Sequence, residues 1–332
     1  HGLSPNIAST SVYGEYKARY FTNSLSFRDE KPRNVDLGRS TKRIVIIGDS
    51  FTEGACVRPN ESIAAVLRAS GLKVISLGKG GNGSLLEFAS FKEYAEPLQP
   101  KVVLWVHYAN DIVDLKKKGM ESSFLMKYLN DDDFSQNLIS RQDEIDDLLR
   151  DYVDRKYREH KLEIERNNIT REQEREIGKE EDVSRGADNL TKGFTVLRLT
   201  EIFKLTIIRG KLGLRPPRPT PPTPADKILR QILKKASDIV SSWDGRLYLI
   251  YLHAFERYQT GREHDVYFRD FVLRTANELK IPIIDVHKEV FTRHEDPLSL
   301  FPGRMARHYN AEGYRLTAEA ISKRLRVDGV FQ

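Results

Sequence analysis

Three side chains in this sequence have the chemistry needed to transfer an acyl group. Ser50 lies in the run Gly-Asp-Ser, directly after an apolar segment. Asn110 follows another apolar segment, and His308 comes just before the last amphipathic segment. A serine hydroxyl beside a histidine base attacks ester carbonyls, and an amide N–H stabilises the oxyanion that forms. Each residue alone gives weak support, because short tripeptides recur by chance and a lone histidine is more often structural.

A glycine-rich run, Leu-Gly-Lys-Gly-Gly-Asn-Gly at 77–83, is a fourth element of this kind. A turn of this composition leaves backbone N–H groups facing an anion. The run lacks the Gly-Lys-Ser/Thr ending of a P-loop, and its spacing differs from the dinucleotide-binding fingerprint. Nucleotide binding is therefore disfavoured.

Five short apolar runs rich in Val, Ile and Leu predict the strands that position these residues, at 42–48, 72–77, 101–107, 246–252 and 281–285. The spacing of apolar residues predicts helices at 59–70, 84–96, 225–242, 264–279 and 310–325. Strands that alternate with helices and are apolar throughout indicate a parallel sheet covered on both faces. Ligands bind such sheets beyond the carboxyl ends of the strands, so the four elements should meet at one edge.

Composition excludes several classes of function. The 54 Lys and Arg residues against 48 Asp and Glu leave a charge of only +6, and no basic motif with interleaved aromatic residues predicts nucleic-acid binding. The single cysteine, Cys56, excludes a disulfide framework and a Cys-based zinc site, and we expect it to be a small buried residue. No histidine has metal-ligand spacing with carboxylates. No run of 18 apolar residues predicts a membrane span.

The interval between the third and fourth strands is too long for one crossover and predicts a charged helical insertion at 119–224. We interpret it as a helical hairpin packed on the core, with a partner-docking arm as the alternative. It ends in a proline-rich stretch, 216–224, that should be an extended connector. The core domain is then 41–118 and 225–332. Residues 1–40 lack a clear period and should form an irregular arm.

The four elements together, in this order, resemble the sequence blocks of the SGNH hydrolase family, also called GDSL-type esterases. The Ser block resembles 48–50, the Gly block 78–83, the Asn block 110–111, and the His block His308. Two flanking segments extend the similarity. Asn-Ser-Leu-Ser-Phe-Arg-Asp at 23–29 is similar to the lead-in of many bacterial members, and Asn-Ala-Glu-Gly-Tyr at 310–314 to the segment after their histidine.

The resemblance implies a flavodoxin-like three-layer α/β/α sandwich with a five-stranded parallel sheet and no cofactor. It also implies that Ser50 is the nucleophile and His308 the base. The oxyanion would be held by the N–H groups of Ser50 and Gly81 and the side-chain amide of Asn110. Gly80 or Gly83 could take the place of Gly81.

The sequence departs from the family pattern at Met305. Family members usually carry an aspartate three residues before the histidine, to orient the imidazole. Here Ser50 and His308 either form a dyad, with a backbone carbonyl orienting the ring, or a carboxylate comes from elsewhere. Asp296 is the nearest candidate, and Glu295 and Asp285 are less favoured.

The function that these inferences favour is a serine esterase acting on small acyl groups, most simply acetyl groups on a carbohydrate. A glycan O-acyltransferase with the same site is one alternative. A non-catalytic relative that binds a glycan or a partner through the insertion is another. Similar bacterial proteins are often exported or tethered at the amino end. We therefore expect a periplasmic or other extracytoplasmic location, with any membrane tether outside this chain, which begins at His1.

Overall fold

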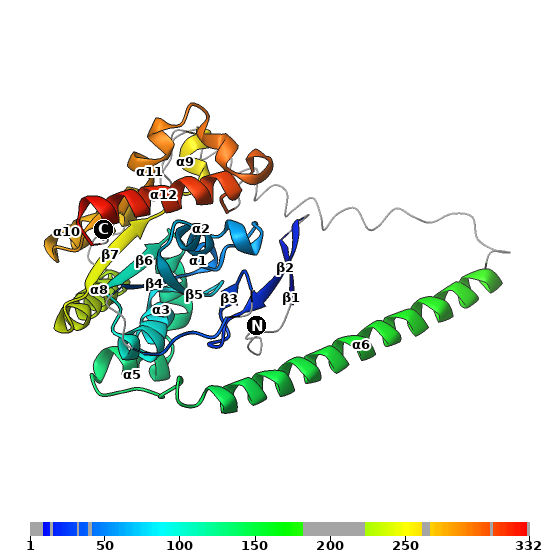
Figure 1. The fold of residues 1–332 in the computed structure, drawn as a ribbon. Coiled ribbons are helices and arrows are strands. Elements are labelled where there is room, and N and C mark those ends of the chain that lie inside the picture. The colour runs from blue at the N-terminus through cyan, green and yellow to red at the C-terminus, as the bar shows by residue number, and fades with distance from the viewer. Residues whose placement is uncertain are drawn as a thin grey trace. The chain divides into compact units, whose positions relative to one another are not determined.

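The five predicted strands form one parallel sheet within the first compact unit (Figure 1). Its order is β5-β4-β6-β7-β8, and the strands are β4 (Arg43–Gly48), β5 (Lys73–Gly78), β6 (Val102–His107), β7 (Arg246–Tyr251) and β8 (Ile283–Asp285). The computed structural model describes residues 9–13, 16–31, 33–38, 42–181, 223–260, 266–305 and 308–330. β4 lies between β5 and β6, so its carboxyl end, where Ser50 follows, is flanked by the ends of both neighbours.

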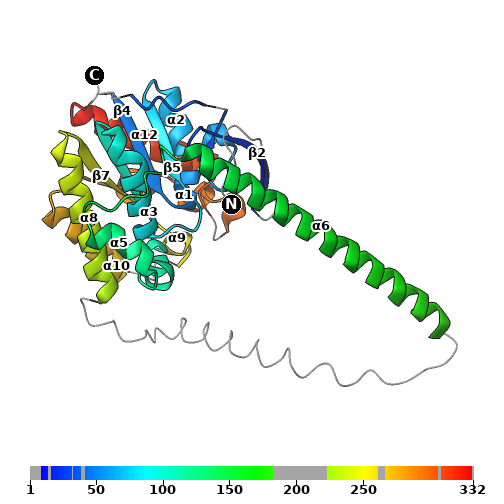
Figure 2. The ribbon, with the colours of Figure 1, turned by 90° about the horizontal axis from the view of Figure 1, so that it is seen from below.

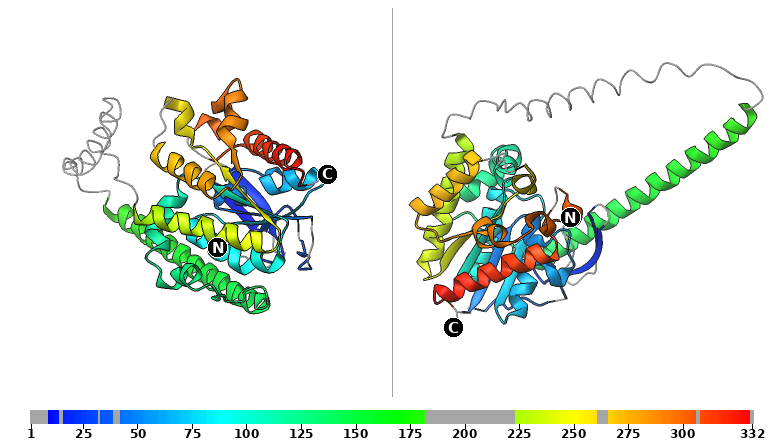
Figure 3. Two further views of the ribbon diagram at one scale, coloured as in Figure 1. Left: turned by 90° about the vertical axis from the view of Figure 1, so that its left-hand side faces the viewer. Right: turned by 90° about the horizontal axis from the view of Figure 1, so that it is seen from above.

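Helices cover both faces of the sheet, because successive residues of each buried strand point to opposite sides. Val45 and Ile47 face a cluster built with α3 (Ser84–Ser90), α5 (Ser123–Asn130), α8 (Pro224–Ser242) and α10 (Val266–Glu278). Ile44 and Ile46 face the other cluster, with α2 (Ile63–Ala69), α11 (Val286–Glu289) and α12 (Ala311–Val327). α3 and α8 lie side by side on the first face (Figure 2), and α2 and α12 on the second (Figure 3). The three-layer α/β/α fold is therefore confirmed.

Several short elements connect the strands to these helices. Four are single α-turns or short helices: α1 (Ser50–Glu53), α4 (Asp111–Asp114), α9 (Phe255–Thr260) and α11. The π-helical turns are Phe91–Ala95 and Leu115–Gly119. The 3₁₀ turns are Pro59–Glu61, Glu96–Leu98, Phe291–Arg293, Pro297–Leu300 and Pro302–Arg304. Most lie at the carboxyl edge of the sheet, where the functional residues gather.

The segment before the core is more regular than the sequence predicts. β1 (Ser9–Tyr13), β2 (Tyr16–Thr22) and β3 (Arg28–Asp29) form a three-stranded antiparallel sheet, so the expectation of an irregular arm over 1–40 is wrong for these residues. Lys17 and Arg19 alternate with aromatic and small residues in β2, which is a period-two signal. This alternation is short and follows the polar pair Gly14-Glu15, which is why the sequence pattern alone does not predict a strand.

The predicted insertion divides between two compact units. Residues 119–150 lie in the first unit with the core, whereas the second unit is Asp151–Pro221. A single helix, α6 (Gln142–Glu181), occupies 40 residues where we expected a hairpin. Any return arm lies outside the described residues, as does most of the proline-rich connector. Its last residue, Pro224, begins α8 behind the capping side chain of Thr223. None of the described helices is long and apolar enough to cross a membrane.

Candidate active site

Ser50 is the first residue of α1 and lies directly beyond the carboxyl end of β4. Asp49 caps this helix, with its carboxylate accepting the Phe51 N–H at 2.9 Å. Gly54, at a φ of 85°, ends the helix after one turn, a left-handed conformation that suits glycine. The Gly-Asp-Ser run thus makes a sharp strand-to-helix turn that exposes the serine side chain at the edge of the sheet.

His308 reaches the same edge from the far end of the chain. The next residue, Tyr309, is fully buried, and its hydroxyl both accepts the His253 N–H and donates to the His253 carbonyl at 2.9 Å. Asn310 then caps α12 by accepting the Gly313 N–H at 3.0 Å. These two anchors fix the backbone on the carboxyl side of His308 and set where its ring lies.

The structure brings Ser50 and His308 into hydrogen-bonding contact. Ser50 Oγ lies 2.7 Å from His308 Nε2, although the two residues are 258 positions apart. The imidazole packs against the Phe51 ring, with centroids 4.6 Å apart. Burial lowers the pKa of His308 to about 4, so the ring is neutral at pH 7 and able to accept the serine proton. This is the geometry of a serine activated by a histidine base.

The glycine-rich loop after β5 supplies a backbone donor. Three of its N–H groups already have protein acceptors: Lys79 donates to the Gly48 carbonyl, Gly80 to Glu53 Oε2, and Asn82 to the Lys79 carbonyl. The Gly81 N–H has no acceptor among the described residues, and Gly81 has a φ of 80°. The Gly80 N–H is therefore disfavoured as an oxyanion donor, whereas the prediction of Gly81, with Gly83 as its alternative, stays open. Gly78 allows the loop to approach α1, since a Cβ there would lie 2.3 Å from the Glu53 nitrogen.

Asn110 follows β6 and occupies the N-cap position of α4, where its side chain makes no capping hydrogen bond. Its side chain hydrogen-bonds to the carboxylate of Asp49, which also accepts from the backbone N–H groups of Ser50 and Phe51. An amide nitrogen carries two protons, so one remains for an oxyanion. The Ser50 N–H already donates to Asp49, so it is a less available oxyanion donor than the sequence predicts.

The structure places the Asp296 carboxylate at the surface, where it forms an ion pair with Arg304. Its role in orienting His308 stays a prediction. Asp285, the less favoured candidate, binds His253 at 3.0 Å and Arg269 at 2.9 Å. Met305, which stands at the sequence position of the family's aspartate, is 48% exposed. The loop from 296 to 305 folds onto itself through the pair of Asp296 with Arg304.

Cys56 lies beside Nδ1 of the His308 imidazole, the ring nitrogen that does not contact Ser50. Its Sγ lies 3.7 Å from His308 Nδ1, within hydrogen-bonding range for sulfur. Cys56 is 8% exposed and adopts a φ of 65°, a conformation that few residues with a Cβ adopt. The sequence identified it only as a small buried residue, because nothing in the local pattern relates position 56 to position 308.

Two flanking motifs hold the loop that carries this cysteine. Arg28, from the lead-in segment, donates to the carbonyls of Gly54 and Val57, both at 2.7 Å. Tyr314, from the segment after the histidine, donates to the Ala55 carbonyl at 3.0 Å. The two motifs therefore meet at one turn, which gives them a structural role in shaping the site.

Three buried carboxylates lie behind the serine, the glycine loop and the asparagine. Besides Asp49, they are Glu87 on α3 and Asp111 at the start of α4, both fully buried. Glu87 accepts from the Trp105 indole at 2.8 Å, and Asp111 contacts His107 Nδ1 at 3.2 Å. Burial, and then the charges of the other carboxylates, raise the pKa of Glu87 and of Asp111 well above the usual range. Sequence reasoning missed Glu87, which looks like an ordinary helix residue.

No group of three or more His, Cys, Asp and Glu side chains in the described segments is arranged to hold a metal ion. The contact that the site offers, a serine hydroxyl beside a neutral imidazole, suits acyl transfer.

Comparisons with known proteins add little to this geometry. The chain matches no protein-family model and no curated protein. Among solved structures it is similar to a member of the lipolytic protein G-D-S-L family from Veillonella parvula DSM 2008, with 14% identity, a TM-score of 0.42, and 85% of this chain and 96% of that chain covered. It is also similar to the lipase/acylhydrolase from Enterococcus faecalis, with 12% identity, a TM-score of 0.44, and coverage of 86% and 96%.

A third similar structure is an acetyl xylan esterase, AlAXEase, with 11% identity, a TM-score of 0.43, and coverage of 85% of this chain and 99% of that chain. At these identities and scores the similarities carry no weight on their own.

Proposed function

We propose that the chain is a serine ester hydrolase of the SGNH type. The observation that carries the proposal is the 2.7 Å contact between Ser50 Oγ and His308 Nε2 at the carboxyl edge of the sheet. The two side chains come from opposite ends of the sequence, and both belong to motifs that resemble the family's blocks. The glycine-rich loop after β5 adds to this support, because the Gly81 N–H has no acceptor among the described residues.

The reaction follows from the positions of these groups. Ser50 Oγ attacks the ester carbonyl while His308 Nε2 takes its proton, and the Gly81 N–H and the Asn110 amide donate to the oxyanion. His308 then returns the proton to the leaving alcohol, which leaves an acyl group on Ser50. Water, activated by the same imidazole, releases the acid. Each oxyanion donor typically lowers the barrier by about 3–4 kcal/mol.

For the acyl group we propose acetyl, and for the alcohol a carbohydrate hydroxyl. The support is the similarity of residues 23–29 to the lead-in of bacterial members of the family. In this protein that segment includes Arg28, which helps to hold the loop beside the histidine.

The test is acetate release from p-nitrophenyl acetate and from an acetylated oligosaccharide by the intact protein, with Ser50→Ala as the control. We expect release that Ser50→Ala loses. An unacetylated oligosaccharide added as acceptor tells hydrolysis from transfer, because a transferase would move acetyl to it in place of water. Release by Ser50→Ala equal to that of the intact protein would overturn the proposal.

A further inference from the structure

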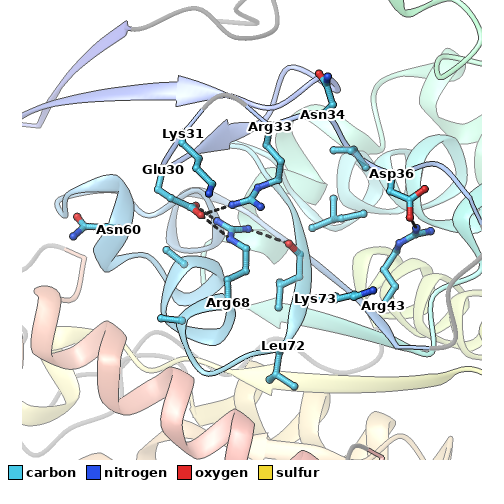
Figure 4. A pocket seen from close by; sticks show the side chains of 15 residues that line it. Glu30, Lys31, Arg33, Asn34, Asp36, Arg43, Asn60, Arg68, Leu72 and Lys73 are labelled. Carbon is cyan, nitrogen blue, oxygen red and sulfur yellow. Dashed lines mark hydrogen bonds and ion pairs between the residues drawn. The ribbon is translucent and has the colours of Figure 1, made fainter.

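A second hollow lies at the opposite end of the sheet from Ser50. It is a pocket of about 680 Å³ between the open edge of β5, the second half of α2 and residues 30–36 (Figure 4). Arg43, the first residue of β4, lines it, whereas Ser50 follows the last residue of that strand. Five steps along a strand span about 17 Å, so the pocket is distinct from the candidate active site.

Arg43 is the most unusual residue in this pocket. Its side chain is only 4% exposed, and its single ion pair among the described residues joins Nη2 to Asp36 Oδ2 at 3.4 Å. Asp36 is itself 80% exposed, so solvent weakens that pair. The other terminal nitrogen, Nη1, is buried and has no hydrogen-bond partner in the described part of the chain. A buried guanidinium N–H without an acceptor is destabilising, and burial lowers the pKa of Arg43 accordingly.

Lys73 adds a second cation at the same place. It is directly opposite Arg43 in the register of β4 and β5, and opposed residues of neighbouring strands point to the same face. Figure 4 shows both side chains at this end of the pocket. Lys73 is exposed and forms no ion pair within the described residues. Like charges directly opposite each other are unfavourable unless an anion lies between them.

Two other arginines at the pocket are paired with acidic side chains. Arg68 and Arg33 both pair with Glu30, and both also reach Asp29 behind it. Arg68 donates in addition to the Val74 carbonyl at 3.0 Å, at the open edge of β5. Lys31 also lines the pocket, so it adds to the positive charge of Arg43 and Lys73.

We propose that this pocket binds a small molecule through an oxyanion group, a carboxylate or a phosphate, held between Arg43 Nη1 and the Lys73 ammonium. The body of the ligand would rest on the apolar floor formed by Val35, Val74 and Ile75. The volume is in the range of pockets that take sugar-sized or drug-sized ligands. This proposal does not depend on the esterase function, because none of these residues touches Ser50 or His308.

The test is isothermal titration of the intact protein, at constant ionic strength, with inorganic phosphate, glucuronate and glucose. We expect at least one of the two anions to bind and glucose, at the same concentrations, to give no heat. Binding of phosphate alone, or of glucuronate alone, identifies which oxyanion the pocket prefers. Failure of both anions to bind would overturn the proposal.

Two matched lysine variants test whether the anion binds in this pocket. Lys73→Gln removes the positive charge of an exposed side chain. It should raise the dissociation constant of the anion about tenfold, the usual effect of losing one charge-assisted contact. Lys227→Gln, which removes the same charge from the exposed face of α8, should leave it unchanged. Ser50→Ala should also bind normally, which separates this test from that of the esterase function. Equal weakening by Lys73→Gln and Lys227→Gln would mean nonspecific charge attraction and would contradict the proposal.

Discussion

His308 lies between Ser50, the Phe51 ring and Cys56, and each neighbour limits what its imidazole can do. Because Nε2 accepts from Ser50, the ring proton of the productive tautomer is on Nδ1 and faces the sulfur of Cys56. A thiol sulfur is a weak acceptor compared with a carboxylate. The Cys56 contact therefore supports the imidazolium formed during the reaction less than an aspartate in its place would.

The buried position of His308 sets the acidic limit of activity. Burial lowers the pKa of this imidazole to about 4, so the ring stays unprotonated, and able to accept the serine proton, well below pH 6. We expect kcat/KM for p-nitrophenyl acetate to fall only as the pH drops through about 4. The measurement is a pH profile of kcat/KM. An acidic limb near 6.5, the value of a solvated histidine, would show that the ring is not desolvated as the structure has it.

Replacing Cys56 tests what supports the Nδ1 side of the ring. Cys56→Ala removes a weak acceptor and should lower kcat/KM by about fivefold, the effect of one neutral hydrogen bond. Cys56→Asp puts a carboxylate in its place, at a φ that aspartate tolerates, and should move the acidic limb to higher pH. Both variants are compared by pH profile and by circular dichroism. An unchanged pH profile in Cys56→Asp would show that residue 56 does not influence the His308 imidazole.

At the scale of elements, the site is where β4, β5 and β6 end and α1, α3 and α4 begin. One buried carboxylate comes from each of these junctions: Asp49, Glu87 and Asp111. Like charges this deeply buried cannot all be ionised, which is why the pKa values of Glu87 and Asp111 are raised by burial and by one another. A proton on Glu87 or Asp111 therefore stabilises the packing of these three strand-to-helix junctions.

This proton gives stability a definite pH dependence. A carboxyl whose pKa is raised in the folded protein contributes fully below its unfolded value of about 4.5 and loses that contribution as the pH rises toward the folded pKa. We expect the free energy of unfolding to fall with rising pH, by up to about 1.4 kcal/mol per pH unit for each carboxyl that titrates.

Glu87→Gln should flatten that slope while keeping the acceptor for the Trp105 indole. Urea unfolding from pH 5 to 9 measures it, with the exposed Glu121→Gln as the control that leaves the slope unchanged. A wild-type slope retained in Glu87→Gln would mean that Glu87 is ionised throughout.

The sequence was informative about elements whose pattern is local. All five strands of the core are recognisable because each is a continuous apolar run with both faces buried. Ser50 and His308 lie at predictable places because parallel strands end at one edge. The contact of Cys56 with His308 and the pair of Asp296 with Arg304 depend on loop conformations that span the chain. No periodicity encodes them, and they required the structure.

At the scale of the whole molecule, the chemistry belongs to the first compact unit. All the site residues and both apolar clusters lie outside Asp151–Pro221. We expect the core to fold when those residues are replaced by a flexible Gly/Ser linker of about 20 residues, which reaches about 25 Å on average.

Such a variant should keep esterase activity on p-nitrophenyl acetate within about threefold, because every residue of the Ser–His contact and of the predicted oxyanion donors belongs to the first unit. Activity and circular dichroism together measure this. A folded variant without activity would show that the second unit contributes to catalysis.

The central claim is that Ser50 is a nucleophile activated by His308. The most direct test is labelling with a small fluorophosphonate, read by peptide mass spectrometry, of the intact protein, Ser50→Ala and His308→Ala. The account predicts a single label on Ser50, none in Ser50→Ala, and labelling at least about 100-fold slower in His308→Ala. A folded, soluble protein that is not labelled at Ser50, or that labels equally fast without His308, would contradict it.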